Sequence, residues 1–158
     1  MIFVECYPDF ALVKSVTHYS KKEIVHVGGR GKVCTRLERT KNCKGMIDED
    51  PWSVSHPYMK KLTKKGNFLK YGIKAFYDNE NQNCLIVLMP RLEEWLLRVA
   101  KEDSIDIKGY DLPENPDDLH DIININLIHV EKLINDMKGT TRVKKLKELL
   151  ENNKIFNR

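Results

Sequence analysis

The chain has 158 residues, of which 41% are hydrophobic, so it can bury one core but is too short for two large domains. The net charge of +4 is only mildly basic, and no apolar run approaches the roughly 20 residues that span a bilayer, which excludes a helical membrane protein. The four cysteines form no C-x-x-C pair, which excludes the usual zinc motifs, and the absence of signal-peptide features predicts a cytoplasmic protein.

Short apolar segments alternate with helix-forming segments in the first fifty residues. Buried strands are predicted at residues 2–6, 23–27 and 45–47, and helices at residues 8–19 and 30–38. Such alternation implies parallel strands that are joined by right-handed crossovers.

The pattern is less regular after residue 50. Residues 56–65 predict a short helix, and residues 71–78 and 83–89 predict two strands around a polar turn. We expect the second of these strands to join the main sheet and the first to lie at an edge. Three further helices are predicted, at residues 91–101, 119–137 and 140–152.

These elements predict a single α/β domain with three layers and a mainly parallel sheet of four or five strands. Its core covers about residues 1–102, and a helical extension follows at about residues 112–158.

Acidic side chains follow two of the predicted parallel strands. Glu5 ends the first strand, and Asp48 and Asp50 end the third. The carboxyl ends of parallel strands meet at one edge of a sheet, where ligands bind. Because strand residues two apart share a side, we expect Asp48 and Asp50 to face one site, with Asp9 as a fourth carboxylate. Such hard oxygens suit Mg²⁺ or Mn²⁺; the alternative is that they only cap loops and turns.

Glycines and basic residues provide candidate contacts to phosphate. Gly28 and Gly29 allow close backbone packing at the rim of the site, where Arg30 and Lys32 could contact a phosphate. The spacing of these residues does not match a P-loop. A second basic stretch follows the D-x-D turn and is a candidate nucleic-acid surface, with a solvated helix face as the alternative. Its members are Lys60, Lys61, Lys64 and Lys65.

Several of these segments resemble the TOPRIM superfamily. The segment from Glu5 to Asp9 resembles the first TOPRIM motif, in which a strand-end glutamate precedes a helix, and residues 48–50 resemble its D-x-D motif. Residues 26–29 resemble the second strand of OLD-family TOPRIM domains. Residues 90–97 are similar to the P-x-F-E-x-W-L-L segment of RloB-like proteins, which aligns Glu93 with the later acidic residue of that group. The resemblance covers roughly the first hundred residues.

The resemblance implies phosphodiester chemistry at Glu5, Asp48, Asp50 and Glu93. Glu5, Asp48 and Asp50 would hold Mg²⁺ or Mn²⁺, and Glu5 would act as general acid or base. Glu93 has an alternative role as a favourable negative charge at a helix N-terminus.

The function expected from the resemblance is a Mg²⁺-dependent nuclease that acts on RNA or DNA. One alternative is a non-catalytic nucleic-acid-binding or regulatory module that kept the fold. Another is a component of a defence system that works with a protein partner or as a homo-oligomer.

Overall fold

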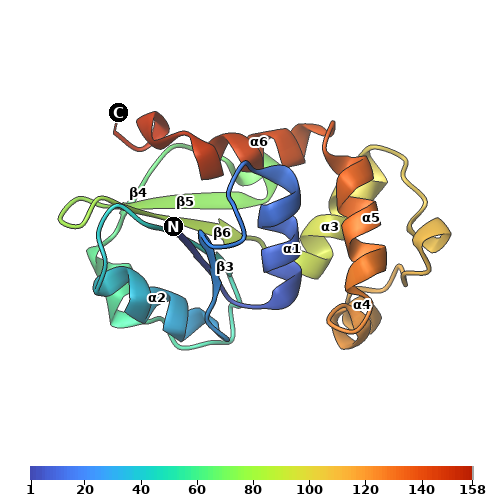
Figure 1. Cartoon of the computed structure of the whole chain (residues 1–158), viewed down its shortest axis with the longest axis horizontal. Coiled ribbons are helices and arrows are strands. Elements are labelled where there is room, and N and C mark those ends of the chain that lie inside the picture. The colour runs from blue at the N-terminus through green and yellow to red at the C-terminus, as the bar shows by residue number, and fades with distance from the viewer. Residues whose placement is uncertain (158) are drawn as a thin grey trace.

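The computed structural model describes residues 1–157. A six-stranded sheet of order β2-β1-β3-β6-β5-β4 runs through the molecule (Figure 1). The strands are β1 (Ile2–Val4), β2 (Ile24–His26), β3 (Lys44–Asp48), β4 (Thr63–Lys64), β5 (Ile73–Asp78) and β6 (Asn83–Leu88). The helices are α1 (Tyr7–Val16), α2 (Arg30–Glu38), α3 (Leu92–Glu102), α4 (Pro116–Ile122), α5 (Leu127–Met137) and α6 (Thr141–Glu151), with 3₁₀ turns at Pro57–Lys61, Leu69–Tyr71, Ile107–Tyr110 and Asn153–Ile155.

The sheet is mixed, which corrects the prediction of a mainly parallel sheet with four or five strands. Strands β2, β1, β3 and β6 are parallel, but β5 pairs antiparallel with β6, and β4 pairs antiparallel with β5. The polar turn between β5 and β6 is too short for the crossover that parallel strands need, so the two strands form a hairpin. The unpredicted β4 takes the edge position that was expected for β5.

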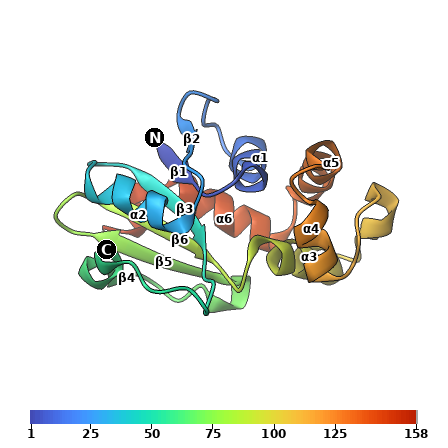
Figure 2. The same cartoon turned by 90° about the horizontal axis from the view of Figure 1, so that it is seen from below.

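Helices cover both faces of the sheet. Helix α2 packs on one face against Phe3, Ile47 and Leu85, whereas α1 and α6 cover the other face (Figure 2). Gly45 allows α2 to approach β3 closely, since a Cβ atom there would lie 2.8 Å from Cδ1 of Leu37. The three-layer α/β arrangement is confirmed.

Helices α3, α4 and α5 lie beyond the carboxyl ends of the parallel strands (Figure 1). The single helix predicted at residues 119–137 is wrong, because the chain leaves the helix at residues 123–126. Asn124 and Asn126 are weak helix formers in this segment. The break lets α4 pack against α3 while α5 packs against α1.

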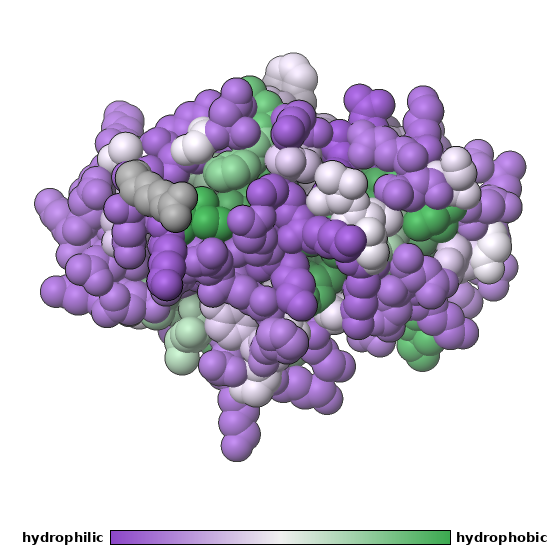
Figure 3. Space-filling model, turned by 90° about the horizontal axis from the view of Figure 1, so that it is seen from above, coloured by the Kyte–Doolittle hydropathy of each residue, from purple (hydrophilic) through white to green (hydrophobic). Residues whose placement is uncertain are grey.

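The face of the molecule seen from the side of α6 is mostly hydrophilic, with small, separate apolar patches (Figure 3). Every helix within residues 1–157 is too short or too polar to cross a membrane.

Candidate functional site

The carboxyl ends of three adjacent parallel strands each deliver a carboxylate to one region. Glu5 follows β1, Asp48 ends β3, and Glu93 lies in the first turn of α3, soon after β6. Oε1 of Glu5 accepts a hydrogen bond of 2.7 Å from the backbone N–H of Asp48. Buried Asp9 joins them from α1, and, after desolvation, its negative charge and those of Glu5 and Glu93 raise the pKa of Asp48. We call Glu5, Asp9, Asp48 and Glu93 the carboxylate cluster.

Three helices begin at this cluster. Asp9 closes the N-terminus of α1 by accepting the backbone N–H of Cys6 at 3.2 Å. Glu5 accepts the backbone N–H of Arg30, the first residue of α2, and Asp48 accepts that of Leu92, the first residue of α3. The positive ends of three helix dipoles therefore point at the cluster and partly offset its negative charge.

Burial makes the charged forms of these carboxylates costly. Desolvation, followed by the charges of its neighbours, raises the pKa of Asp48 to about 9. Desolvation also raises the pKa of Asp9 to about 7 and is the main cause of the raised pKa of Glu5. Oδ1 of Asp48 and Oε2 of Glu93 are buried and have no hydrogen-bond partner in the described part of the chain. Two acceptor oxygens of the cluster are thus buried without a donor from the described residues.

Asp50 lies outside the buried part of the site. Strand β3 ends at Asp48, and Asp50 has a positive φ of 37°, so the two-residue alternation of a strand does not extend to it. Asp50 is exposed and sits close enough to Glu5 to raise the pKa of Glu5. The side chain of Arg30 donates to the backbone oxygens of Glu49 and Asp50 and to Oγ of Ser53, so this arginine anchors the loop after β3.

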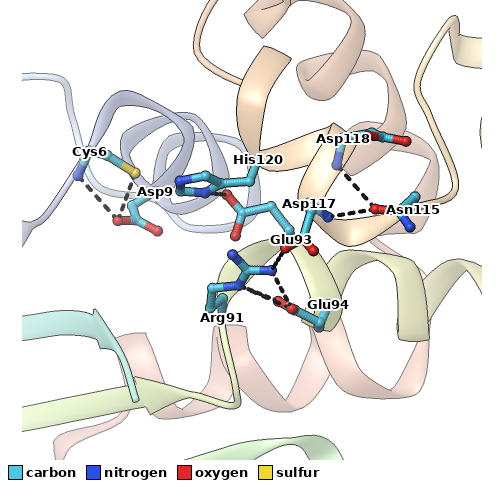
Figure 4. Close-up of polar contacts among 9 residues, drawn as sticks. All are labelled: Cys6, Asp9, Arg91, Glu93, Glu94, Asn115, Asp117, Asp118 and His120. Atoms are coloured by element: carbon cyan, nitrogen blue, oxygen red, sulfur yellow. Dashed lines mark hydrogen bonds and ion pairs between the residues drawn. The ribbon is translucent and has the colours of Figure 1, made fainter. Parts of the chain in front are cut away.

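Sequence reasoning did not identify His120 of α4 as a site residue. Its Nδ1 lies 2.9 Å from Oε1 of Glu93, and Figure 4 shows the imidazole between Glu93 and Asp9. No motif marks His120 in the sequence, because the helix that carries it belongs to the C-terminal extension, outside the TOPRIM resemblance. His120 is a candidate because α4 packs on α3 in the folded chain, and no local sequence pattern indicates that contact.

A cleft of about 450 Å³ opens beside the cluster. Asp50, Trp52, Arg91, Glu94, Asp117 and His120 contribute to its walls. None of the four cluster carboxylates lines this cleft, but two of its lining residues adjoin the cluster: His120 contacts Glu93, and Asp50 lies near Glu5.

The predicted basic residues divide into two groups. Arg30 and exposed Lys32 lie in the first turn of α2, beside Gly28, Gly29 and the cluster. The four lysines after the D-x-D turn lie toward the opposite edge of the sheet: Lys61 pairs with Glu38 at the far end of α2, and the ammonium of Lys65 lies 5.7 Å from the ring centroid of Tyr77. Lys60 and Lys64 are exposed in the same region, so closeness in sequence to the D-x-D turn does not bring these lysines to the carboxylates. Their role in binding nucleic acid stays a prediction.

The side chains of the cluster do not form a closed cage of metal ligands. Within residues 1–157, no three His, Cys, Asp or Glu side chains are arranged to hold one ion. Mg²⁺ is commonly held by one or two carboxylates together with water and substrate phosphates. Glu5, which accepts the backbone N–H of Asp48, and Asp48, which has an unsatisfied buried oxygen, are the candidate ligands for such an ion.

We expect the protein without metal to lose stability as the pH rises from about 5 to about 8. Asp9 and Asp48 have raised pKa values, so the folded state keeps protons that the unfolded state has already lost. Folding stability from these groups is complete in acid and is lost as the pH rises through about 7 and about 9. The lowered pKa of Lys44, about 8, opposes this trend only at higher pH.

Urea unfolding in EDTA at each pH measures the effect, which is about 1.4 kcal/mol per pH unit for each retained proton and should reach several kcal/mol. The slope should be shallower in Asp48→Asn and in wild-type protein with Mg²⁺. Stability that rises over this range in wild type would contradict the burial of these carboxylates.

The chain matches no known protein-family model, and no curated protein or solved structure matches it either.

Proposed function

We propose that this protein is a divalent-cation-dependent phosphodiesterase that cleaves RNA or DNA. The observation that carries the proposal is the pair of buried carboxylate oxygens without partners, Oδ1 of Asp48 and Oε2 of Glu93, inside a cluster of four carboxylates. A buried carboxylate that lacks a partner is costly, and a hard cation with a bound phosphate offsets that cost.

The arrangement is the one that we would expect of a TOPRIM-like site. A glutamate after the first strand, an aspartate at the end of the third strand and a later glutamate lie at one sheet edge. The resemblance of residues 48–50 to the D-x-D motif supports the same proposal. In this proposal Asp50 contributes from the outer rim of the site, because it is exposed.

Glu5 and Asp48 would hold Mg²⁺ or Mn²⁺, which supplies charge stabilisation at the phosphoryl oxygens and a more acidic bound water. We assign to Glu5 the removal of a proton from the attacking water, the general acid or base role that the TOPRIM resemblance implies. The N-termini of α2 and α3 orient Glu5 and Asp48 through backbone N–H groups. Lys32, which is exposed at the start of α2, would bind another phosphate of the same polynucleotide.

A second candidate is a non-catalytic module that binds nucleic acid through the same fold. The absence of three metal-ligating side chains around one point, within residues 1–157, favours this candidate. The second candidate requires that the protein bind nucleic acid without cleaving it, whereas the first requires binding and cleavage.

The test uses end-labelled single-stranded and double-stranded RNA and DNA, incubated with Mg²⁺ or Mn²⁺. We expect cleavage of at least one substrate, no cleavage in EDTA, and recovery when the cation is added back. Binding of the same oligonucleotides, measured by fluorescence anisotropy over a salt series, separates the two candidates. Binding without cleavage under every cation condition supports the non-catalytic module, and neither binding nor cleavage refutes both.

A further inference from the structure

We propose that His120 is the general acid of this site and protonates the leaving oxygen of the phosphodiester. The inference rests on the proposed function and assigns a catalytic part to the C-terminal helical extension. The observation that supports it is that α4 packs on α3 beside the carboxylate cluster, where His120 forms part of the wall of the cleft.

Helix α4 is fixed at its first turn. The side chain of Asn115 accepts the backbone N–H groups of Asp117 and Asp118, at 3.0 and 3.2 Å, which caps the helix (Figure 4). Arg91 then donates to Asp117 at 2.9 Å and also pairs with Glu94 in α3. Arg91 thus ties the start of α4 to the start of α3.

A second contact follows one helical turn later. His120 is three residues after Asp117, so both side chains lie on the same side of α4. Glu93, which is only 5% exposed, holds Nδ1 of His120 at 2.9 Å. An ionised carboxylate can only accept a hydrogen bond, so Nδ1 carries a proton and the ring orientation is set. The ion pair of Asp117 and the contact of His120 together dock α4 at two points.

The remaining ring nitrogen is available for proton transfer. Within residues 1–157, Nε2 of His120 has no hydrogen-bond partner, and 57% of the side chain is exposed. The charged groups around the ring are Glu93 on α3, Asp9 on α1, and Asp50, Arg91, Glu94 and Asp117 along the cleft. Acidic groups predominate among them.

The proton balance of the step is simple. The water oxygen forms a bond to phosphorus, and the bond between phosphorus and the leaving ester oxygen breaks. Glu5 takes a proton from the water, and Nε2–H of His120 gives its proton to the leaving oxygen. The products are a phosphomonoester and an alcohol, and proton exchange with solvent returns Glu5 and His120 to their starting forms.

The test compares two substrates that differ in the leaving group. A dinucleotide has a basic alkoxide leaving group that needs a proton, whereas a p-nitrophenyl ester of a nucleotide releases a stable phenolate. His120→Ala should lower kcat on the dinucleotide about a hundredfold or more and change kcat on the p-nitrophenyl ester little. Added imidazole should restore part of the lost activity on the dinucleotide.

Two further variants separate catalysis from structure. In His120→Asn the amide nitrogen can still donate to Glu93, but it cannot transfer a proton, so this variant should lose activity as His120→Ala does. Asp121→Asn alters an exposed side chain on the same helix and should behave as wild type.

Each outcome decides the inference. Equal losses on both substrates, activity retained in His120→Asn, or no loss in His120→Ala would overturn the role of His120 while the proposed function stands. A wild-type protein that cleaves neither substrate with Mg²⁺ or Mn²⁺ would overturn the proposed function and the inference with it.

Discussion

Replacing Asp48 with asparagine should slow Mg²⁺-dependent cleavage by about a thousandfold, which corresponds to about 4 kcal/mol of transition-state stabilisation. The substitution removes the negative charge that holds the cation. It keeps an oxygen that can accept the backbone N–H of Leu92, so the start of α3 stays in place.

The same variant should be more stable than wild type when metal is absent. Asp48 shares its site with Asp9, Glu5 and Glu93, and desolvation, followed by the charges of these neighbours, raises its pKa to about 9. At neutral pH the metal-free wild type must keep a proton on Asp48 or bury its charge among like charges, and asparagine removes that cost. Thermal unfolding in EDTA and in Mg²⁺ measures both effects, since Mg²⁺ should stabilise wild type but not Asp48→Asn.

Asp121→Asn serves as the matched control, because it removes an exposed aspartate charge elsewhere. A variant that cleaves slowly and also unfolds at a much lower temperature in EDTA would mean that Asp48 is a structural residue.

The two tryptophans should differ by several kcal/mol in their contribution to stability. Trp95 has no exposed surface, and its indole N–H donates to the backbone oxygen of Tyr71 at 2.8 Å. Trp95→Ala removes a large buried side chain and leaves that oxygen without its donor, so we expect a loss of about 3–5 kcal/mol. Trp52 is 94% exposed, and Trp52→Ala should change stability by less than about 0.5 kcal/mol.

Guanidinium unfolding followed by circular dichroism gives both values without relying on tryptophan fluorescence. The fluorescence of each variant is an internal check, because the tryptophan left in Trp95→Ala is open to acrylamide and the one left in Trp52→Ala is protected. Similar stabilities of the two variants would contradict the packing of α3 against the sheet.

The sequence was sufficient to predict the four parallel strands of the sheet. Apolar segments at β1, β2, β3 and β6 are short and uninterrupted, and the interval between successive parallel strands leaves room for a crossover. The prediction of α2 at residues 30–38 agrees with its observed bounds, because Gly29 and the buried positions Val33, Cys34 and Leu37 define its start and inner face. The strand ends, and with them Glu5 and Asp48, follow from this regularity.

Other features depend on tertiary contacts that no local pattern contains. Strand β4 is two residues long and exists because Thr63 and Lys64 reach the free edge of β5. The helix predicted at residues 56–65 is only a 3₁₀ turn at Pro57–Lys61. Tyr58 of this turn is buried, and its hydroxyl donates a hydrogen bond to Asp78. Asp50 departs from the expected alternation because Arg30, nineteen to twenty residues earlier, fixes the backbone of its loop.

The contacts of Lys44 bear on the order in which the parts of this chain can fold. This buried lysine begins β3, and its ammonium donates to the backbone oxygens of Leu149 and Leu150 at the end of α6, more than a hundred residues later. Until α6 has been synthesised and has left the ribosome, the ammonium and the part of this sheet face that α6 covers stay exposed. The nascent chain therefore exposes a hydrophobic surface throughout most of its translation, and its folding cooperativity depends on contacts of high sequence separation.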